Sequence, residues 1–126
     1  MGRKIGYWVS TSLVVAMMLF DSVLYLSGST VAVEGFTHLG YPQHLRIILG
    51  MAKLTGAMIL IAPGFRVLKE WAYAGFTFAL AVASVAHASA GDGIKSIVPL
   101  VLLGLLIVSY LTMPSSRRLA AATVSA

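Results

Sequence analysis

The chain has 126 residues, of which 59% are hydrophobic and 10% are charged, and its mean hydropathy is +0.92. A soluble domain of this length buries only part of its surface and could not hide so many apolar residues from water. We therefore expect a single integral membrane domain over residues 1–126. The absence of cysteine excludes disulfides, thiolate catalysis and cysteine-bound metal clusters. The formal net charge of +5 comes from basic residues beside apolar runs, which is typical of membrane topology signals and not of nucleic-acid binding.

Four stretches of the chain are long and apolar enough to cross a bilayer as helices. A hydrocarbon core of about 30 Å needs about 20 helical residues at about 1.5 Å each. The predicted spans cover residues 5–26, 45–62, 71–90 and 94–113, and the breaks between them fall at glycine and proline. The sequence therefore predicts an all-α integral membrane four-helix bundle. A tail over 114–126 follows, and we expect it to be disordered from Leu119 onward.

The segment 30–44 between the first two spans is too short and too polar to cross the membrane. Its apolar residues Val31, Val33, Phe36 and Leu39 can share one side of a short helix. Pro42 ends this helix, because proline restricts the preceding residue and lacks a backbone N–H. We expect the segment to lie at the interface or to re-enter the mouth of the bundle, where it would act as a cap.

Four spans place both termini on one side of the membrane. A loop expected at 65–70 belongs to the same side. The basic residues of this side are Arg3, Lys4, Arg66, Lys69, Arg117 and Arg118. The opposite side carries Arg46 and Lys95 together with Glu34 and Asp92. The positive-inside rule then makes both termini cytoplasmic, in a multi-pass protein of the cytoplasmic (inner) membrane.

Three ionisable residues inside the predicted spans define the candidate site. Lys53 lies about eight residues, roughly 12 Å, into the second span. Asp21 lies about 16 residues, roughly 24 Å, from the inner end of the first span, and His87 is at a similar depth in the third. A charge at bilayer depth costs about 2.5 to 3.5 kcal/mol on insertion scales, so such residues face the protein interior and pair. We expect Asp21, Lys53 and His87 to meet in the outer half of the bundle.

Two interpretations of this cluster are open. In the functional one, Lys53 binds an anionic or carbonyl oxygen, Asp21 is a general base or counter-ion, and His87 carries a proton near neutral pH, so the three are the candidate catalytic residues. In the structural one, Asp21 and Lys53 form an ion pair that fixes helix register, with His87 hydrogen-bonded to one of them. The candidate ligand-binding residues are polar neighbours of the cluster and of the capping segment: Tyr25, Glu34, His38, Tyr41 and Ser84.

Haem and metal chemistry are not favoured by the sequence. One histidine in a span, His87, is weak evidence for a haem ligand. Glu34, His38 and His44 lie on an irregular polar segment, where solvated side chains are ordinary. We therefore predict no metal site.

Four stretches in order along the chain carry a further signal. They are VEGFTHLGYP at 33–42, LGMAKLTGAMILI at 49–61, LKEWAYAGFTF at 68–78 and HASAGDG at 87–93. Taken together they resemble the DoxX-like family of small bacterial four-helix membrane proteins, over nearly the whole chain from about Tyr7 to Met113. The positions that carry over are Glu34, His38, Tyr41, Pro42, Lys53, Glu70, Trp71, His87 and Asp92.

The resemblance implies a bacterial membrane bundle linked to redox chemistry, because the namesake branch is associated with a quinone-coupled thiosulfate oxidoreductase. With the polar cluster, it predicts a site for a hydrophobic small molecule, either a quinone as cofactor or a lipid-like substrate, with proton-transfer or redox-linked chemistry. One alternative is a non-catalytic accessory subunit or chaperone of a membrane complex. A small transporter is a second, less favoured because four spans without a repeat would need to oligomerise. The expected partners are membrane lipid, the hydrophobic molecule, and a redox-complex protein or a second copy of the chain.

Overall fold

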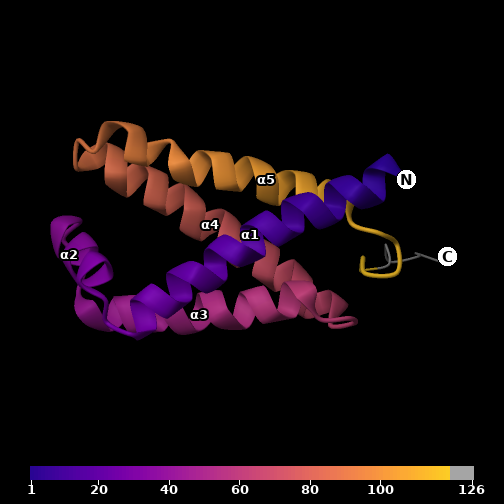
Figure 1. Ribbon diagram of the computed structural model, residues 1–126, viewed down its shortest axis with the longest axis horizontal. Coiled ribbons are helices and arrows are strands. Elements are labelled where there is room, and N and C mark those ends of the chain that lie inside the picture. The colour runs from indigo at the N-terminus through magenta and orange to yellow at the C-terminus, as the bar shows by residue number, and fades with distance from the viewer. Residues whose placement is uncertain (120–126) are drawn as a thin grey trace, which may run out of the picture.

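Five α-helices and one short 3₁₀ helix make up the part of the chain that the structure describes (Figure 1). The structure is a computed structural model, and it describes residues 1–119. In chain order the elements are α1 (Gly2–Leu26), α2 (Thr30–His38), α3 (Gln43–Ile61), α4 (Arg66–Ser89), η1 (Gly93–Ser96) and α5 (Val98–Thr112). α1, α3, α4 and the stretch Gly93–Thr112 are each long and apolar enough to cross a membrane. The prediction of an all-α fold with four apolar helices is confirmed.

The four long helices run alternately between two ends of the molecule. α1 packs on α3 and α5, and α4 packs on the same two helices, so α1 and α4 are diagonal partners in the bundle. Both chain termini lie at one end, which we call the termini end (Figure 1). α2 lies at the other end, the α2 end, where α1 and α4 finish (Figure 1). The short helix therefore covers only one mouth of the bundle.

A buried polar network ties three of the long helices together in the core. The Ser109 hydroxyl of α5 lies 2.6 Å from the Thr11 hydroxyl of α1 and 2.7 Å from the Tyr73 hydroxyl of α4. All three side chains are buried among apolar residues. Because these groups satisfy one another, they can lie in the core without the cost of an unpaired polar atom.

The fourth long helix, α3, approaches α4 closely through a glycine. A Cβ atom at Gly56 would lie 2.6 Å from the ring of Phe76 on α4, so only glycine fits without a shift of the ring. Small interface residues allow helix backbones in membranes to come together in this way. Gly56 lies about one helical turn after Lys53 on α3, so this contact holds α3 against α4 next to the candidate site.

The loop expected at 65–70 is wrong, because α4 begins at Arg66. The reversal is completed within a few residues: Gly64 has φ 77° and Phe65 has φ 51°, so two consecutive residues take the left-handed conformation. Glycine adopts this conformation at little cost, whereas Phe65 must be held there by its surroundings. The tight turn leaves Lys69 in the first turns of α4, fully buried, instead of in a solvated loop.

Lys69 caps the C-terminal end of α3. Its ammonium donates to the backbone carbonyls of Ile59 at 2.8 Å and Gly64 at 2.7 Å, and also to that of Ala62. The last carbonyls of a helix have no partner within the helix and carry partial negative charge, so a cation there stabilises the helix end. The three N–H bonds of Lys69 are all used by this cap.

The predicted fourth span is interrupted, and the predicted tail is partly ordered. Proline cannot lie inside a regular helix, so the chain forms η1 first and α5 starts with Pro99 in its first turn. After α5, Arg117 folds back onto the bundle. Its guanidinium donates to the hydroxyl of Tyr7 at 2.8 Å and to the carbonyl of Leu60 at 2.7 Å. The remainder of the expected disordered tail, residues 120–126, lies outside the described residues.

Candidate functional site beneath helix α2

Lys53 and Asp21 form an ion pair across the interface between α1 and α3. Lys53 Nζ lies 2.9 Å from Asp21 Oδ2 and 3.2 Å from the hydroxyl oxygen of Tyr25, one turn further along α1. The ammonium also lies 4.4 Å from the centre of the Tyr25 ring. The side chains of Lys53 and Asp21 are only 13% and 25% exposed. Two of the three charges expected to meet are therefore in direct contact.

His87 does not join this pair, contrary to the expected three-way contact. Its Nδ1 lies 2.6 Å from Asp92 Oδ2, and Nε2 of His38 on α2 lies 2.7 Å from the other oxygen of the same carboxylate. Asp92 comes only five residues after His87, and Gly91, with φ 75°, turns the chain back over the end of α4. The nearby carboxylate of Asp92 thus binds the ring that was expected to contact Asp21 or Lys53. The three residues His38, Asp92 and His87, here called the His-Asp-His clamp, fasten α2 to the corner after α4.

The clamp fixes the protonation pattern of its histidines. The hydrogen bonds from His87 and then His38 hold the pKa of Asp92 below its usual range, so the carboxylate is ionised. An ionised carboxylate only accepts hydrogen bonds, so His87 presents Nδ1–H to it and His38 presents Nε2–H. In neutral His87 the lone pair is then on Nε2, the ring nitrogen that points away from Asp92.

A cavity of about 450 Å³ joins the two polar groups beneath α2. Lys53 from α3 and His87 from α4 both line it, as do the rings of Tyr25 and Tyr41. The other lining residues are apolar or small: Phe36, Leu39, Leu45, Leu49, Gly75, Phe78, Ala79, Val82 and Ala83. An apolar cavity with a few polar groups is the usual form of a small-molecule site. His87 therefore shares a site with Lys53 even though the two are not bonded.

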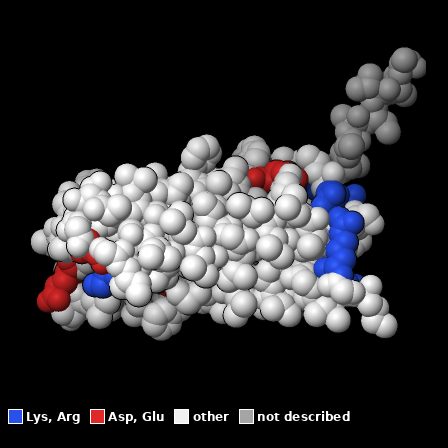
Figure 2. Space-filling view, turned by 90° about the horizontal axis from the view of Figure 1, so that it is seen from above, with Lys and Arg blue, Asp and Glu red and all other residues white. Residues whose placement is uncertain are grey.

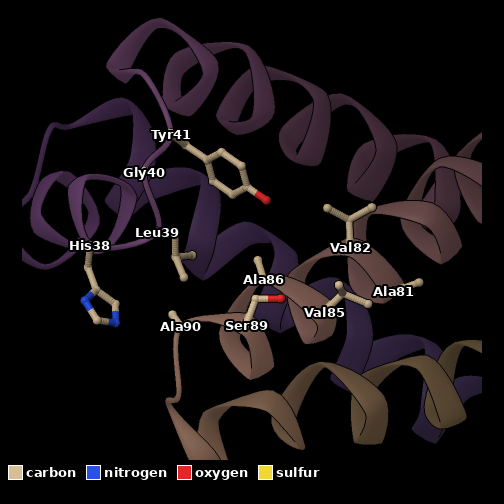
Figure 3. A pocket seen from close by; sticks show the side chains of 10 residues that line it. All are labelled: His38, Leu39, Gly40, Tyr41, Ala81, Val82, Val85, Ala86, Ser89 and Ala90. Carbon is tan, nitrogen blue, oxygen red and sulfur yellow. The ribbon is translucent and has the colours of Figure 1, made fainter.

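A second hollow, of about 580 Å³, adjoins this cavity between the end of α2 and α4 (Figure 3). The two share Leu39, Tyr41 and Val82 in their walls. Figure 3 shows that the Tyr41 side chain extends from the α2–α3 connection toward Val82 and that its hydroxyl oxygen points into the hollow. Small residues line the opposite wall, including Ala86 of α4 and Ala90, which directly follows this helix. The combined hollow is elongated and mainly apolar, and Lys53 lies where it meets a further groove of about 500 Å³ between α3 and α4.

Aromatic contacts and a basic residue hold α2 over the cavity. The buried Phe36 ring packs edge-on against Tyr25 with 5.1 Å between ring centres, and it lies 6.2 Å from the ring of Tyr41. Gln43 at the start of α3 donates to the Val33 carbonyl of α2 at 3.1 Å. Arg46 holds Gln43 in place, because it donates to the Gln43 side-chain oxygen at 2.8 Å and to the last-turn carbonyl of Tyr25. α2 thus caps the mouth of the bundle and is anchored to α1, to α3 and, through the clamp, to Asp92.

Two residues of the predicted ligand-binding set lie away from the cavity. Glu34 is on the exposed face of α2. Ser84 donates to the backbone carbonyl of Ser96 at 2.6 Å and so ties α4 to η1. Tyr25 and Tyr41 line the cavity, and His38 reaches the adjoining hollow through the clamp. Within residues 1–119, no group of three or more His, Asp or Glu side chains is placed to hold a metal ion.

Sequence reasoning placed Asp92 in a turn and missed its part in the site. The signal was an acidic residue between two glycines, five positions after a histidine at the end of an apolar span. That spacing lets the chain fold back and return the carboxylate to the last turn of the helix. Arg46, which binds the end of α1, was also missed. It follows α2 in the chain and lies at the start of α3, so no local pattern links it to the free carbonyls of α1.

The four apolar helices and the partly buried charges between them define a multi-pass membrane protein with polar groups in the wall of an apolar cavity. The model of the DoxX-like family matches residues 9–109, and the chain belongs to this family. The matched region contains every residue that lines the cavity. Comparison with curated proteins and with solved structures gives no match. The family resemblance found in the sequence is confirmed.

Replacing Asp92 with asparagine is expected to loosen α2. The neutral amide retains one acceptor oxygen and cannot hold both histidines as a carboxylate does, because charge-assisted hydrogen bonds are the stronger ones. We expect amide hydrogen exchange across α2 to speed up about fivefold, while α5 is unchanged. Glu34→Gln, the same chemical change on the exposed face of α2, is the control. Equal exchange in the two variants would show that the clamp does not hold α2.

Proposed function

We propose that this DoxX-like protein binds an amphipathic small molecule, quinone-like or lipid-like, in the cavity beneath α2. The observation that carries the proposal is the presence of a cation, Lys53, in the wall of an elongated, mainly apolar hollow. The polar head of the molecule lies at Lys53, and its apolar body extends past Val82 into the hollow between α2 and α4. Ionisable side chains in the interior of a membrane bundle usually mark functional sites.

Lys53 is suited to bind an oxygen of the head group. An ammonium has three N–H donors, and Asp21 and Tyr25 accept two of them. The third donor is available to a carbonyl or anionic oxygen in the cavity. Asp21 compensates the charge of Lys53 when the cavity is empty, and Tyr25 fixes the direction of the ammonium.

His87 is suited to move a proton in the same cavity. Asp92 holds the Nδ1–H, so Nε2 is the ring nitrogen that takes up or releases a proton in the cavity. If the bound molecule is a quinone, this gives a path for protons to its oxygen atoms. In this proposal Lys53 positions the molecule, His87 transfers protons and Asp21 acts as the counter-ion.

The charges also support an orientation in a bacterial cytoplasmic membrane. Figure 2 shows a band of Lys and Arg at the termini end with one acidic patch nearby, whereas acidic and basic side chains lie side by side at the α2 end. The positive-inside rule places the termini end in the cytoplasm. The cavity then lies in the outer half of the bundle, where a molecule of the outer leaflet can reach it.

Native mass spectrometry of protein extracted gently from its source membrane tests the proposal. We expect the wild type to carry a discrete molecule of defined mass that is lost from Lys53→Met and retained by Lys95→Met, the same change at an exposed lysine of the α2 end. Ala83→Phe narrows the cavity without touching the ion pair and should also lose the molecule, whereas Ala88→Phe, at an exposed position of α4, should keep it. The result that contradicts the proposal is a wild type that carries only bulk lipid or only a co-purifying protein, as an accessory subunit would.

A further inference from the structure

A second pocket lies at the termini end, at the opposite end of the bundle from the cavity beneath α2. Its volume is about 490 Å³, and Arg3, Lys4 and Arg118 line it. Its other lining residues have uncharged side chains: Met1, Thr112, Met113, Pro114 and Ser115. Figure 2 shows the Lys and Arg side chains as a band across this end of the molecule. The pocket therefore concentrates positive charge, and no acidic side chain of residues 1–119 lines its wall.

The helix α5 holds two of these cations in place. Nη2 of Arg3 donates to the carbonyl of Leu111 at 3.2 Å. Nη2 of Arg118 donates to the carbonyls of Tyr110 at 3.3 Å and Leu111 at 3.1 Å. Each guanidinium has five N–H donors, so most of them are left for another acceptor. Guanidinium groups with fixed positions and free N–H pairs suit the oxygens of a phosphate.

The neighbouring charged groups of this end are engaged elsewhere. Arg117 is directed into the bundle toward Tyr7 and Leu60, and Arg66 donates to the carbonyl of Ser116 at 2.9 Å. The carboxylate of Glu70 accepts a hydrogen bond from the Tyr110 hydroxyl at 2.9 Å and does not line the pocket. The charge of Arg3, Lys4 and Arg118 is thus not compensated within the pocket wall.

Apolar surface leads away from the pocket along the two helices that bear it. On α1, Ile5 and Val9 are 61% and 55% exposed, and on α5, Val108 and Leu111 are 44% and 61% exposed. These residues belong to spans that are apolar enough to lie in a membrane. A molecule with a phosphate head and acyl chains would match both features, because its head would meet the cations and its chains would follow the exposed side chains.

We propose that this pocket binds the phosphate headgroup of an anionic membrane lipid. Basic pockets at the cytoplasmic ends of membrane helices suit such headgroups. Arg3 and Arg118 contact the phosphate oxygens, and Lys4 adds a mobile third charge. This site is independent of the proposed ligand beneath α2, and it would bind lipid whether or not that cavity is occupied.

Lipid titration of the delipidated full chain in a neutral detergent, followed by native mass spectrometry, tests this site. The probes are phosphatidylglycerol and, with the same acyl chains, zwitterionic phosphatidylcholine. We expect the first to bind at least about tenfold more tightly, and Lys4→Gln to lose about fivefold in affinity for it. Lys4 is exposed, so its replacement leaves the fold intact. Arg66→Gln, which removes an exposed charge at the same end but outside the pocket, is expected to leave affinity unchanged.

Three results would overturn the site. The first is equal binding of the two lipids, and the second is an equal effect of Lys4→Gln and Arg66→Gln. The third is displacement of phosphatidylglycerol by equimolar glycerol 3-phosphate, since a soluble phosphate that binds as well as the lipid would mean that the apolar surface of α1 and α5 contributes nothing. Failure of this test would leave the cavity at Lys53 unaffected.

Discussion

Lys69→Met is expected to lower the free energy of unfolding by about 3 kcal/mol, the largest effect of any single change at the termini end. The methionine side chain fills a similar volume but donates no hydrogen bond, so the carbonyls of Ile59, Ala62 and Gly64 lose their shared partner at a fully buried position. The end of α3 would also lose its compensating charge. Unfolding of the purified protein by sodium dodecyl sulfate in mixed micelles, followed by circular dichroism, measures the change.

Two further variants separate the cap from charge in general. Lys4→Met removes an exposed lysine at the same end of the molecule, and we expect it to change stability by less than about 0.5 kcal/mol. Lys69→Arg retains the charge but replaces a compact ammonium with a planar guanidinium, which three converging carbonyls cannot all meet, so an intermediate loss is expected. If Lys69→Met were as stable as Lys4→Met, the capping role of Lys69 would be wrong.

Lys53→Met and Asp21→Asn are each expected to destabilise the protein by about 2 kcal/mol, and the double variant by less than the sum. Each single change leaves one charged side chain without its partner at a mostly buried position. The double change removes both charges, so no uncompensated charge is left. Unfolding measurements on the wild type and the three variants give the coupling free energy, for which we expect about 1 to 2 kcal/mol.

The same variants distinguish the structural from the functional interpretation of the pair. The double variant should recover part of its stability yet still fail to bind the molecule held by the wild type, because the ammonium that contacts the head group is gone. Recovery of both properties together would mean that the pair serves only to support the fold. A coupling free energy of zero would show that the contact between Asp21 and Lys53 contributes nothing to the bundle.

The sequence was sufficient to predict the spans because apolar length is a local property. Each predicted span overlaps one long helix, and the shared face of Asp21 and Tyr25 follows from their four-residue spacing on α1. The depth of Lys53 along its span also led directly to its pairing with Asp21. These predictions needed only helix geometry and the cost of placing charge in lipid.

The remaining features depend on how the chain turns at its corners. Arg66 and Lys69 look like residues of a basic loop, and only the tight turn at Gly64 and Phe65 brings Lys69 onto a helix with its ammonium at the end of α3. His87 was placed with Asp21 and Lys53 by depth, but it contacts Asp92 instead, because Gly91 reverses the chain. The depth of a residue in the membrane gives its position along the helix axis but not the direction in which its side chain points about that axis. The cavity itself arises from the gap beneath α2, which no local pattern reveals.

The measurement that tests the cavity most directly is photocrosslinking with a quinone and a fatty acid, each with a diazirine in its apolar tail. The account predicts that labelled peptides, mapped by mass spectrometry, concentrate at residues 36–49 and 75–87. This labelling should be suppressed by an excess of the unlabelled compound and lost in Lys53→Met. Labelling of both probes that spreads over the exposed face of α5, with equal yield in the wild type and Lys53→Met, would contradict a binding site beneath α2.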